Sequence, residues 1–499
     1  MPGAENGVVA AGHPLTAQAG ARILREGGNA VDAAVGAMLT SFVAEPLLTG
    51  LGAGGYMLVA GAGRVPELLD FFVAAPTDPR ASDPDDTSAA ELFAISVSFG
   101  FAMQVFHVGP ASCAVYGAPA GACEAARRWG TMPLAALALP AARLAREGVV
   151  LNRGQAYVAE ILSDLLKSTP ECAALWAPHG HVLREGEVLR NGELADALER
   201  LGAEGEAPFY TGEVAQAVCD WLQARGGTLT LADLAAYEAV PREPVRIAYR
   251  DREVLTNPPP SAGGTLLAYS LALLDRASAP PSLAELVGAM AAAQAERTPE
   301  FLEGLGEEDF LGRFLASKLG STTHISVLDA QGCACSVTCT NGECSGVVVP
   351  GTGLHLNNVM GEEDLNPLGF HRHPAGRRMP SMMAPTIVTR DGEVELVLGS
   401  AGSNRIRSAV LQTIIRVIDD GMEAGDAVRA PRVHFEDGIV YAEPGVDTAA
   451  LERAGRAIGR FRELNLFFGG AQAAARDEHG RFSGGGDPRR GGAAVVVSA

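Results

Sequence analysis

The segment Ser321-Thr322-Thr323-His324 places hydroxyl side chains at the start of a predicted strand, where one of them could act as a nucleophile. A serine or threonine hydroxyl attacks a carbonyl carbon efficiently only when a base removes its proton. Hydroxyl residues in front of a strand usually serve a turn instead, because their side chains hydrogen-bond to the nearby backbone. The local sequence therefore leaves a turn and an acyl-transfer nucleophile as alternatives.

A glycine loop, Gly50-x-Gly52-x-x-Gly55, has the spacing of a dinucleotide-binding fingerprint. That motif requires a strand before it and a helix after it, since the pyrophosphate binds at the helix N-terminus. Here a predicted helix (29–44) precedes the loop and a predicted strand (56–59) follows it. The order argues against an oxidoreductase, and the glycines are better explained by a tight backbone turn.

Two groups of residues could bind a metal ion. His371-Arg-His373, with Asp364 nearby, lies among glycines and prolines, which indicates a solvated loop. Cys333, Cys335 and Cys339 share one parity and would lie on one face of a strand, with Cys344 nearby. No paired Cys-x-x-Cys spacing occurs, so small buried residues are the better interpretation. We expect neither a metal nor a cofactor.

The composition is that of a soluble globular protein, with 47% hydrophobic and 20% charged residues. The net charge of −20 repels polyanions, so a nucleic-acid partner is not expected. The residues after Met1 lack the basic and apolar regions of a secretion signal. The longest uncharged stretch, 92–123, is broken by glycines and prolines and does not predict a membrane helix. These features favour a cytoplasmic protein with reduced cysteines and no membrane association.

The predicted elements change character along the chain. Helical patterns dominate the first half, with a strand at 7–11, whereas strands dominate after residue 322. The segment 276–320 contains Pro280-Pro281 and an acidic, glycine-containing stretch, which predicts a mobile surface segment. After it, strands at 323–329 and 334–340 flank the turn 330–332 and predict a hairpin. Further elements are predicted as helices at 14–26, 266–274 and 406–420 and as strands at 386–388, 395–398 and 493–497.

Several long motifs follow one another in the order of one known family. They are AAGHPLTAQAGARILREGGNAVDAAV (10–35), EPLLTGLGAGGYML (45–58), GGTLTLADLAAYEAV (226–240), NPPPSAGG (257–264), STTHISVLDAQG (321–332), SGVVVPGTGLHLNN (345–358) and MMAPTIV (382–388). With these motifs the chain resembles the γ-glutamyltranspeptidase family over about residues 8–498.

The resemblance implies an α+β fold, the four-layer αββα sandwich of the N-terminal-nucleophile hydrolases. It also implies an inactive precursor that splits between Ser321 and Thr322. The large fragment would comprise 1–321, with the mobile segment at about 276–321, and the small one 322–499, both in one core. The cut has a chemical purpose, because it turns an amide nitrogen of Thr322 into an α-amine with a pKa of about 8, which can act as the base.

The resemblance also implies the catalytic residues. Thr322 would form the acyl ester, and Thr340 matches the threonine that hydrogen-bonds the nucleophile. The backbone N–H groups of Gly402 and Ser403 match the oxyanion-binding loop. A γ-glutamyl amide such as glutathione is the implied substrate. The implied partners are the large and small fragments of the same precursor, and neither a nucleic acid nor a membrane is expected.

Substrate-binding residues carry over with two departures. Asn341 and Glu362 match the side chains that hold the substrate's α-amino group, and Ser381 matches a serine that binds its α-carboxylate. Phe72 stands in place of the carboxylate-binding arginine, and Met382 in place of a second serine. Losing a charged hydrogen bond of roughly 1.5–3 kcal/mol predicts about 10- to 100-fold weaker γ-glutamyl recognition.

These departures leave alternatives open. Arg377 or Arg378 could replace the missing arginine, or the acyl group could be glutaryl-like or apolar, as in related acylases. The 20 residues between Met360 and Ser381 lack a tyrosine and are short for a lid, so we expect an open site in which hydrolysis outweighs transpeptidation. A precursor that never matures and serves as a non-catalytic binding protein is the alternative of another class.

Overall fold

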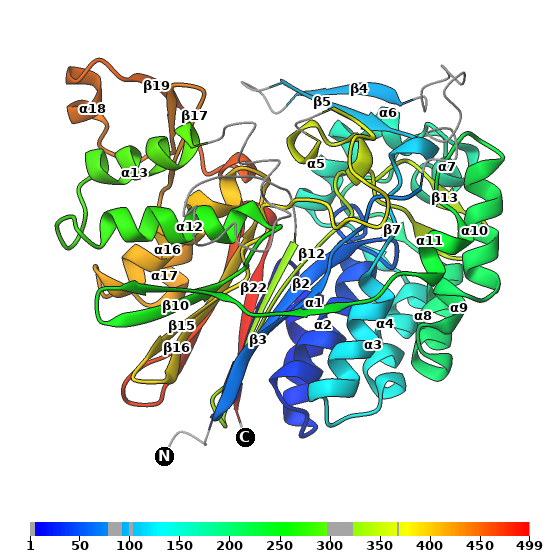
Figure 1. Ribbon diagram of the computed structural model, residues 1–499, viewed down its shortest axis with the longest axis horizontal. Coiled ribbons are helices and arrows are strands. Elements are labelled where there is room, and N and C mark those ends of the chain that lie inside the picture. Colours follow the sequence, from blue (N-terminus) through cyan, green and yellow to red (C-terminus); the bar gives the residue numbers. More distant parts are fainter. Residues whose placement is uncertain (1–4, 78–91, 99–102, 297–322, 367–368, 499) are drawn as a thin grey trace.

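Two antiparallel sheets lie face to face between two layers of helices in the computed structural model (Figure 1). The structure describes residues 5–77, 92–98, 103–296, 323–366 and 369–498. The first sheet has the order β22 (Ala493–Ser498), β1 (Glu5–Ala11), β11 (Thr323–Asp329), β12 (Cys333–Thr340), β2 (Gly54–Gly61), β3 (Arg64–Phe71) and β8 (Val240–Arg242). The second has the order β21 (Phe482–Gly486), β20 (Gly470–Arg476), β16 (Glu393–Ala401), β15 (Thr386–Arg390), β10 (Arg252–Thr256) and β9 (Val245–Tyr249).

Each helical layer closes one outer face of the sandwich (Figure 1). The first sheet is covered by α1 (Pro14–Arg25), α2 (Ala30–Ala44), α3 (Ala118–Trp129), α4 (Leu134–Glu147) and α8 (Gly192–Glu204), and the second by α12 (Ala262–Leu274), α13 (Leu283–Ala295), α16 (Arg405–Ile418) and α17 (Ala424–Arg429). Smaller helices continue the first layer: α5 (Arg153–Ile161), α6 (Ser163–Leu166), α7 (Pro170–Trp176), α9 (Ala207–Tyr210), α10 (Glu213–Gln223) and α11 (Leu231–Ala235). The predicted four-layer αββα architecture is confirmed.

Helix α2 shows how the sequence builds this core. Asn29 caps the helix, and its side chain accepts hydrogen bonds from the amides of Val31 and Asp32, while Asp32 accepts one from the Asn29 amide. All residues from Ala30 to Ala44 are buried, as the uncharged run predicted. The helix ends at Glu45, which is therefore carried into the interior next to the first sheet.

The predicted hairpin is confirmed, and its register fixes which residues meet. Thr323 pairs with Cys339 at one end, and Leu328 pairs with Ala334 next to the turn. The prediction that three cysteines share one face of a strand is also confirmed, because Cys333, Cys335 and Cys339 all face the helical layer in one apolar cluster. The eight cysteines form no disulfide.

Segments from both sides of residue 322 interleave in both sheets. In the first sheet β1 lies between β22 and β11, and in the second β10 lies beside β15. A chain divided at that point would consequently still share its two sheets. The division itself stays a prediction, because residues 297–322 lie outside the described part of the chain.

The segment predicted to be mobile contains an ordered helix in its first part. Ser282 and Glu285 form a capping box at the start of α13, and Val287, Met290 and Ala293 pack into the helical layer over the second sheet. The prolines before this helix thus mark its boundary rather than a long irregular stretch. None of the helices in the described part of the chain is long and apolar enough to span a bilayer.

Candidate active site

The strand ends around the predicted nucleophile are well defined, although Ser321 and Thr322 themselves lie outside the described residues. Thr323, the next residue, opens β11 opposite Cys339, and Thr340 follows at the end of β12. Thr340 is buried, and its Oγ1 accepts a hydrogen bond of 2.8 Å from the Gly342 amide. The predicted orienting hydroxyl is therefore held at the edge where the hairpin reaches the predicted cleavage point.

The predicted oxyanion loop connects β16 to α16. Gly402 has φ +119° and Ser403 φ +55°, so both residues leave the strand in positive-φ conformations. A side chain at Gly402 would bring its Cβ within 2.7 Å of the Gly469 Cα, which explains the need for glycine. The carbonyls of Gly402 and Ser403 accept hydrogen bonds of 3.0 Å from the amides of Arg405 and Ile406, which fix the loop to the helix start.

A cavity adjoins this loop. Its lining combines Gly402 and Ser403 of the loop with apolar side chains. The lining residues are Leu47, Leu48, Phe106, Val158, Ile161, Leu162, Gly342, Glu343, Gly402, Ser403, Arg405, Leu466 and Arg490. A second, more apolar cavity shares Leu47, Leu48, Val158, Leu466 and Arg490 with the first and extends to His13, Glu45, Val149, Leu151, Trp176 and Leu189.

Glu45 ties the start of β11 to the helical layer. Its Oε2 accepts a hydrogen bond of 2.8 Å from Thr323 Oγ1, and its Oε1 accepts one of 2.9 Å from Thr16 Oγ1. A Cβ at Gly12 would overlap the carboxylate, so glycine leaves room for it. Burial raises the pKa of Glu45 to about 7, while the two threonine hydroxyls and the charge of Arg490 lower it.

We expect Glu45→Gln to change the pH dependence of stability. A carboxyl whose pKa is raised by folding leaves the free energy of unfolding unchanged below pH 4.5. It lowers that free energy progressively between pH 4.5 and 7 and by a constant amount above pH 7. At about 1.36 kcal/mol per pKa unit, the free energy of unfolding of the parent should fall by about 3 kcal/mol between pH 4.5 and 7. That of the glutamine variant should not fall in this way. Thermal unfolding between pH 4.5 and 8.5 measures this, with exposed Glu26→Gln as the control. Parallel curves for parent and Glu45→Gln would contradict it.

The residues matched to α-amino binding lie behind the cavity wall. Asn341 donates from Nδ2 to the His355 carbonyl at 3.0 Å, and its buried Oδ1 has no partner in the described part of the chain. Glu362 is only 7% exposed, and a Cβ at Gly342 would overlap its carboxylate. Gly342, with φ +63°, thus separates Glu362 from the cavity by backbone alone.

The two departures from the family pattern are buried in apolar cores. Phe72 is fully buried between the sheets, and its ring stacks on Tyr56 at 5.6 Å between centroids. Met382 is fully buried in the core over the second sheet. Ser381 Oγ accepts a hydrogen bond of 2.9 Å from the Met383 amide. None of the three lines either cavity beside the oxyanion loop.

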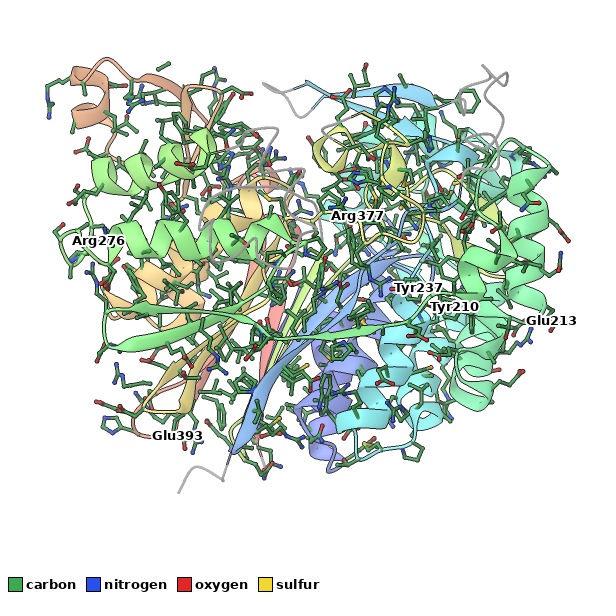
Figure 2. The ribbon with its side chains drawn as sticks, viewed as in Figure 1. Tyr210, Glu213, Tyr237, Arg276, Arg377 and Glu393 are labelled. Carbon is green, nitrogen blue, oxygen red and sulfur yellow. The ribbon has the colours of Figure 1, made fainter. Side chains whose placement is uncertain are left out.

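Arg378 is committed to a structural ion pair. Its Nε lies 3.4 Å from Asp70 Oδ1, and its guanidinium stacks over the Tyr237 ring at 4.3 Å. Tyr237 in turn stacks on Tyr210 (Figure 2). Arg378 is therefore held against β3, next to the edge strand β8 of the first sheet. Arg377, whose carbonyl accepts from the Ala75 amide at 2.9 Å, does not line the two cavities either.

His324 and the histidines considered as metal ligands make contacts typical of structural residues. His324 is buried between the sheets, hydrogen-bonded to Thr338 and Ser326, and burial lowers its pKa to about 3, so the ring is neutral. His373 Nε2 lies 3.3 Å from the Leu365 carbonyl. Across the described ranges, no three His, Cys, Asp or Glu side chains gather as a metal site.

Sequence reasoning missed Glu45 and Arg490. Both lie in short motifs, EPLLTG and DPRR, whose residue types are unremarkable in isolation. Their approach to the cavity depends on the stacked sheets and on contacts between segments hundreds of residues apart. Burial of charged residues next to glycines is the signal that the structure adds.

The sequence matches the family model "Gamma-glutamyltranspeptidase" over residues 16–311 and 307–497. The chain belongs to the γ-glutamyltranspeptidase family. It is 32% identical to the acylase ACY 1 proenzyme of Pseudomonas sp. (strain SE83), covering 99% of this chain and 94% of that protein. It is 30% identical to the glutathione hydrolase proenzyme of Escherichia coli (strain K12), covering 97% and 91%.

Solved structures agree with this family assignment. The crystal structure of cephalosporin acylase from Bacillus halodurans superposes with a TM-score of 0.84 at 27% identity and covers 99% of this chain and 96% of that one. The crystal structure of Helicobacter pylori γ-glutamyltranspeptidase gives a TM-score of 0.50 over 57% of this chain and 81% of that one. This member of the γ-glutamyltranspeptidase family is an enzyme with the N-terminal-nucleophile hydrolase fold.

Proposed function

We propose that this family member is a self-processing N-terminal-threonine acylase that hydrolyses amides through an ester on Thr322. One observation carries the proposal: Gly342, whose amide donates to Thr340 Oγ1, lines the same cavity as Gly402 and Ser403. Thr340 itself ends the strand that pairs with the start of β11. This arrangement supplies an orienting hydroxyl and backbone donors next to the position of the nucleophile.

The proposed reaction has two halves. Thr322 Oγ attacks the amide carbonyl while the α-amine of Thr322 takes its proton, and the Gly402 and Ser403 amides stabilise the oxyanion. The amine then returns the proton to the leaving nitrogen, and an acyl ester remains on Thr322. Water, deprotonated by the same amine, attacks that ester and releases the acid. The precursor is cut by the same hydroxyl, which attacks the Ser321 carbonyl. The amide bond between Ser321 and Thr322 breaks, the nitrogen takes up a proton and becomes the α-amine, and water hydrolyses the resulting ester to release the Ser321 carboxylate and the Thr322 hydroxyl.

The acyl group is proposed to be glutaryl-like or apolar. Phe72 is packed against Tyr56 between the sheets and Met382 is buried, so neither position offers a donor to an α-carboxylate. The cavity next to the oxyanion loop has an apolar wall. The family likeness by itself favours a γ-glutamyl amide such as glutathione, and the nearby Glu362 carboxylate supports that second candidate.

A panel of p-nitroanilides tests the proposal. We expect the processed protein to hydrolyse glutaryl- or pentanoyl-p-nitroanilide with a kcat/KM about 10-fold or more above that for the γ-glutamyl compound. Both acyl groups lack the α-ammonium group, and the side chains matched to that group, Asn341 and Glu362, do not line the cavity. A missing charged contact to the ammonium costs about that much. A preference for the γ-glutamyl substrate would reverse the choice of acyl group. An uncut chain that hydrolyses none of them would favour the non-catalytic alternative.

A further inference from the structure

Arg490 lies at the junction of the two cavities beside the predicted oxyanion loop. It ends the turn η6 (Pro488–Arg490), which connects β21 to β22. Its side chain lines both cavities, together with Leu47, Leu48, Val158 and Leu466. A ligand that entered either cavity would therefore meet the same guanidinium.

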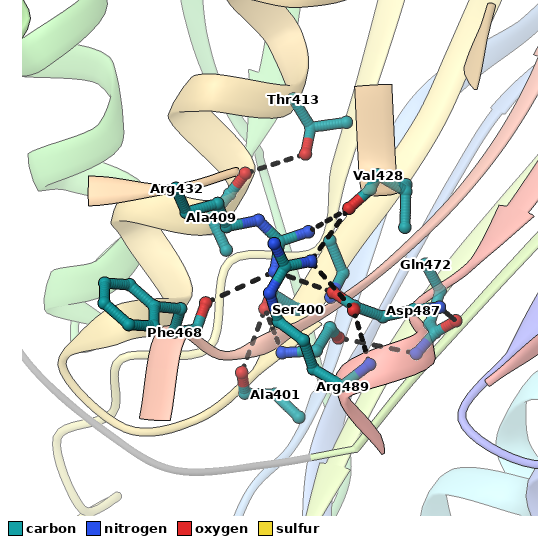
Figure 3. Close-up of polar contacts among 12 residues, drawn as sticks. Ser400, Ala401, Ala409, Thr413, Val428, Arg432, Phe468, Gln472, Asp487 and Arg489 are labelled. Atoms are coloured by element: carbon teal, nitrogen blue, oxygen red, sulfur yellow. Dashed lines mark hydrogen bonds and ion pairs between the residues drawn. The ribbon is translucent and has the colours of Figure 1, made fainter. Parts of the chain in front are cut away.

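The Arg490 guanidinium has no partner among the residues that the structure describes. It makes no hydrogen bond or ion pair with any residue that the structure describes, and its Nε is buried without a partner. Its neighbour Arg489 pairs with Glu443 and Asp487, and Arg432 pairs with Asp487 (Figure 3). Because a buried charge costs free energy unless it is paired, an unpaired guanidinium in a cavity wall points to an anionic ligand.

Two glycines make room for this side chain next to the site. A Cβ at Gly470 would overlap the Arg490 stem, and a Cβ at Gly402 would lie 3.4 Å from Arg490 Nη2. The guanidinium therefore lies against the oxyanion loop itself. A ligand carbonyl held by Gly402 and Ser403 would be within the length of a short side chain of Arg490.

Hydrogen bonds fix the backbone turn that carries Arg490. Asp487 Oδ1 accepts a hydrogen bond of 3.0 Å from the Arg489 amide, and the Asp487 carbonyl accepts one of 3.2 Å from the Arg490 amide. Asp487 is anchored in turn by the Ala471 amide at 2.8 Å. The paired arginines of this network (Figure 3) thus fix the turn from which Arg490 extends.

The surrounding charges do not neutralise Arg490 by direct contact. Burial lowers the pKa of Arg490 to about 10, helped by Arg405, whereas Asp487, Glu45 and Glu343 raise it. The group therefore stays charged at neutral pH. Asp487 is already shared by two arginines, and both oxygens of Glu45 accept from threonines.

We propose that Arg490 binds a carboxylate of the substrate, in place of the arginine that the family has where this chain has Phe72. The inference rests on the proposed amide hydrolysis and adds the class of substrate: an amide with an apolar body and a carboxylate that reaches the junction of the two cavities. The two N–H edges of the guanidinium match the two oxygens of a carboxylate.

Steady-state kinetics of Arg490→Gln and Arg490→Lys test this inference. The substrates are glutaryl-p-nitroanilide, its neutral carboxamide analogue, and the same carboxamide acyl group on 4-aminobenzoate, which moves the carboxylate to the leaving group. We expect Arg490→Gln to raise KM about 10- to 100-fold for one carboxylate substrate, with kcat and the neutral analogue changed by less than about 3-fold. Arg490→Lys should lose less, because it keeps the charge.

The carboxylate substrate whose KM rises shows whether Arg490 binds a carboxylate on the acyl group or one on the leaving group. Arg481→Gln is the matched control, since it removes the same charge from a side chain that is 73% exposed. Equal losses on charged and neutral substrates, or no loss on either, would overturn the inference.

Calorimetric titration of glutarate and 4-aminobenzoate separates this inference from the proposed function. Binding of one of them to the parent and weaker binding to Arg490→Gln would support the anion site even if no amide is hydrolysed. Unchanged binding in the glutamine variant would overturn it. Gel analysis and thermal unfolding verify that the variants fold. If Arg490→Gln does not fold, Arg490→Lys, which keeps the positive charge, is compared with the parent instead.

Discussion

Thr322→Ala is expected to leave a single chain of 51.6 kDa and to reduce amide hydrolysis by roughly 10⁴-fold or more. Alanine lacks the Oγ that would attack the Ser321 carbonyl during maturation and the substrate carbonyl during turnover. Without the cut, the nitrogen of residue 322 also remains an amide, so both nucleophile and base are missing. Denaturing gels, intact mass and the p-nitroanilide assay measure the three consequences.

Thr322→Ser is the informative control, because serine keeps a hydroxyl and an α-amine. We expect it to be cut, more slowly than the parent, and to retain measurable activity. Thr323→Ser provides a neighbouring control that preserves the hydrogen bond to Glu45. Cleavage of the alanine protein before residue 322, or parent-like turnover, would contradict the mechanism.

Asp487→Ala should have the largest effect on stability, destabilising the fold by about 3–5 kcal/mol, because it leaves a buried arginine without its counter-ion. Asp487 Oδ2 lies 2.6 Å from Arg432 Nη1, and Asp487 Oδ1 lies 3.1 Å from Arg489 Nη1, with all three side chains at most 1% exposed. Arg489 keeps Glu443, but Arg432 has no other ion-pair acid among the described residues. The melting temperature reports the loss.

A partly exposed aspartate, whose side chain is 33% exposed, tests whether burial is the cause. Asp477→Ala removes a partner of Arg481, a side chain that is 73% exposed, and should cost less than about 1 kcal/mol. Asp487→Asn should lie between the two, since it removes the charge but keeps an oxygen that can accept from the Arg489 amide. Similar melting temperatures for Asp487→Ala and Asp477→Ala would refute the account of a buried charge network.

The local elements followed from local patterns. Alternating residues around the turn 330–332 predicted the hairpin, and the parity of its cysteines predicted their common face. Helix α2 followed from an uncharged run between Asp32 and Glu45. In each case the backbone hydrogen bonds close within a few residues, so the periodicity of the nearby side chains is enough to select the element.

The family motifs also predicted which residues form the site, but they gave only the positions of these residues along the chain and not their arrangement in space. The structure places Gly402 and Ser403 in the wall of one cavity, together with Gly342, which donates to Thr340, whereas it places Phe72 and Met382 in apolar cores. The roles of Ser321 and Thr322 stay predictions from the motif and its chemistry.

By itself, the sequence determined the family, the order of the strands and helices, and the residues available for an N-terminal threonine nucleophile. Only the tertiary structure decided that Glu45 contacts Thr323, that Arg378 pairs with Asp70, and that Arg490 lies beside Gly402 with no ion-pair partner in the described part of the chain. The physical reason is that these contacts join segments far apart in the chain. Their free energies depend on burial and on pairing between stacked sheets, which no local pattern of residues records.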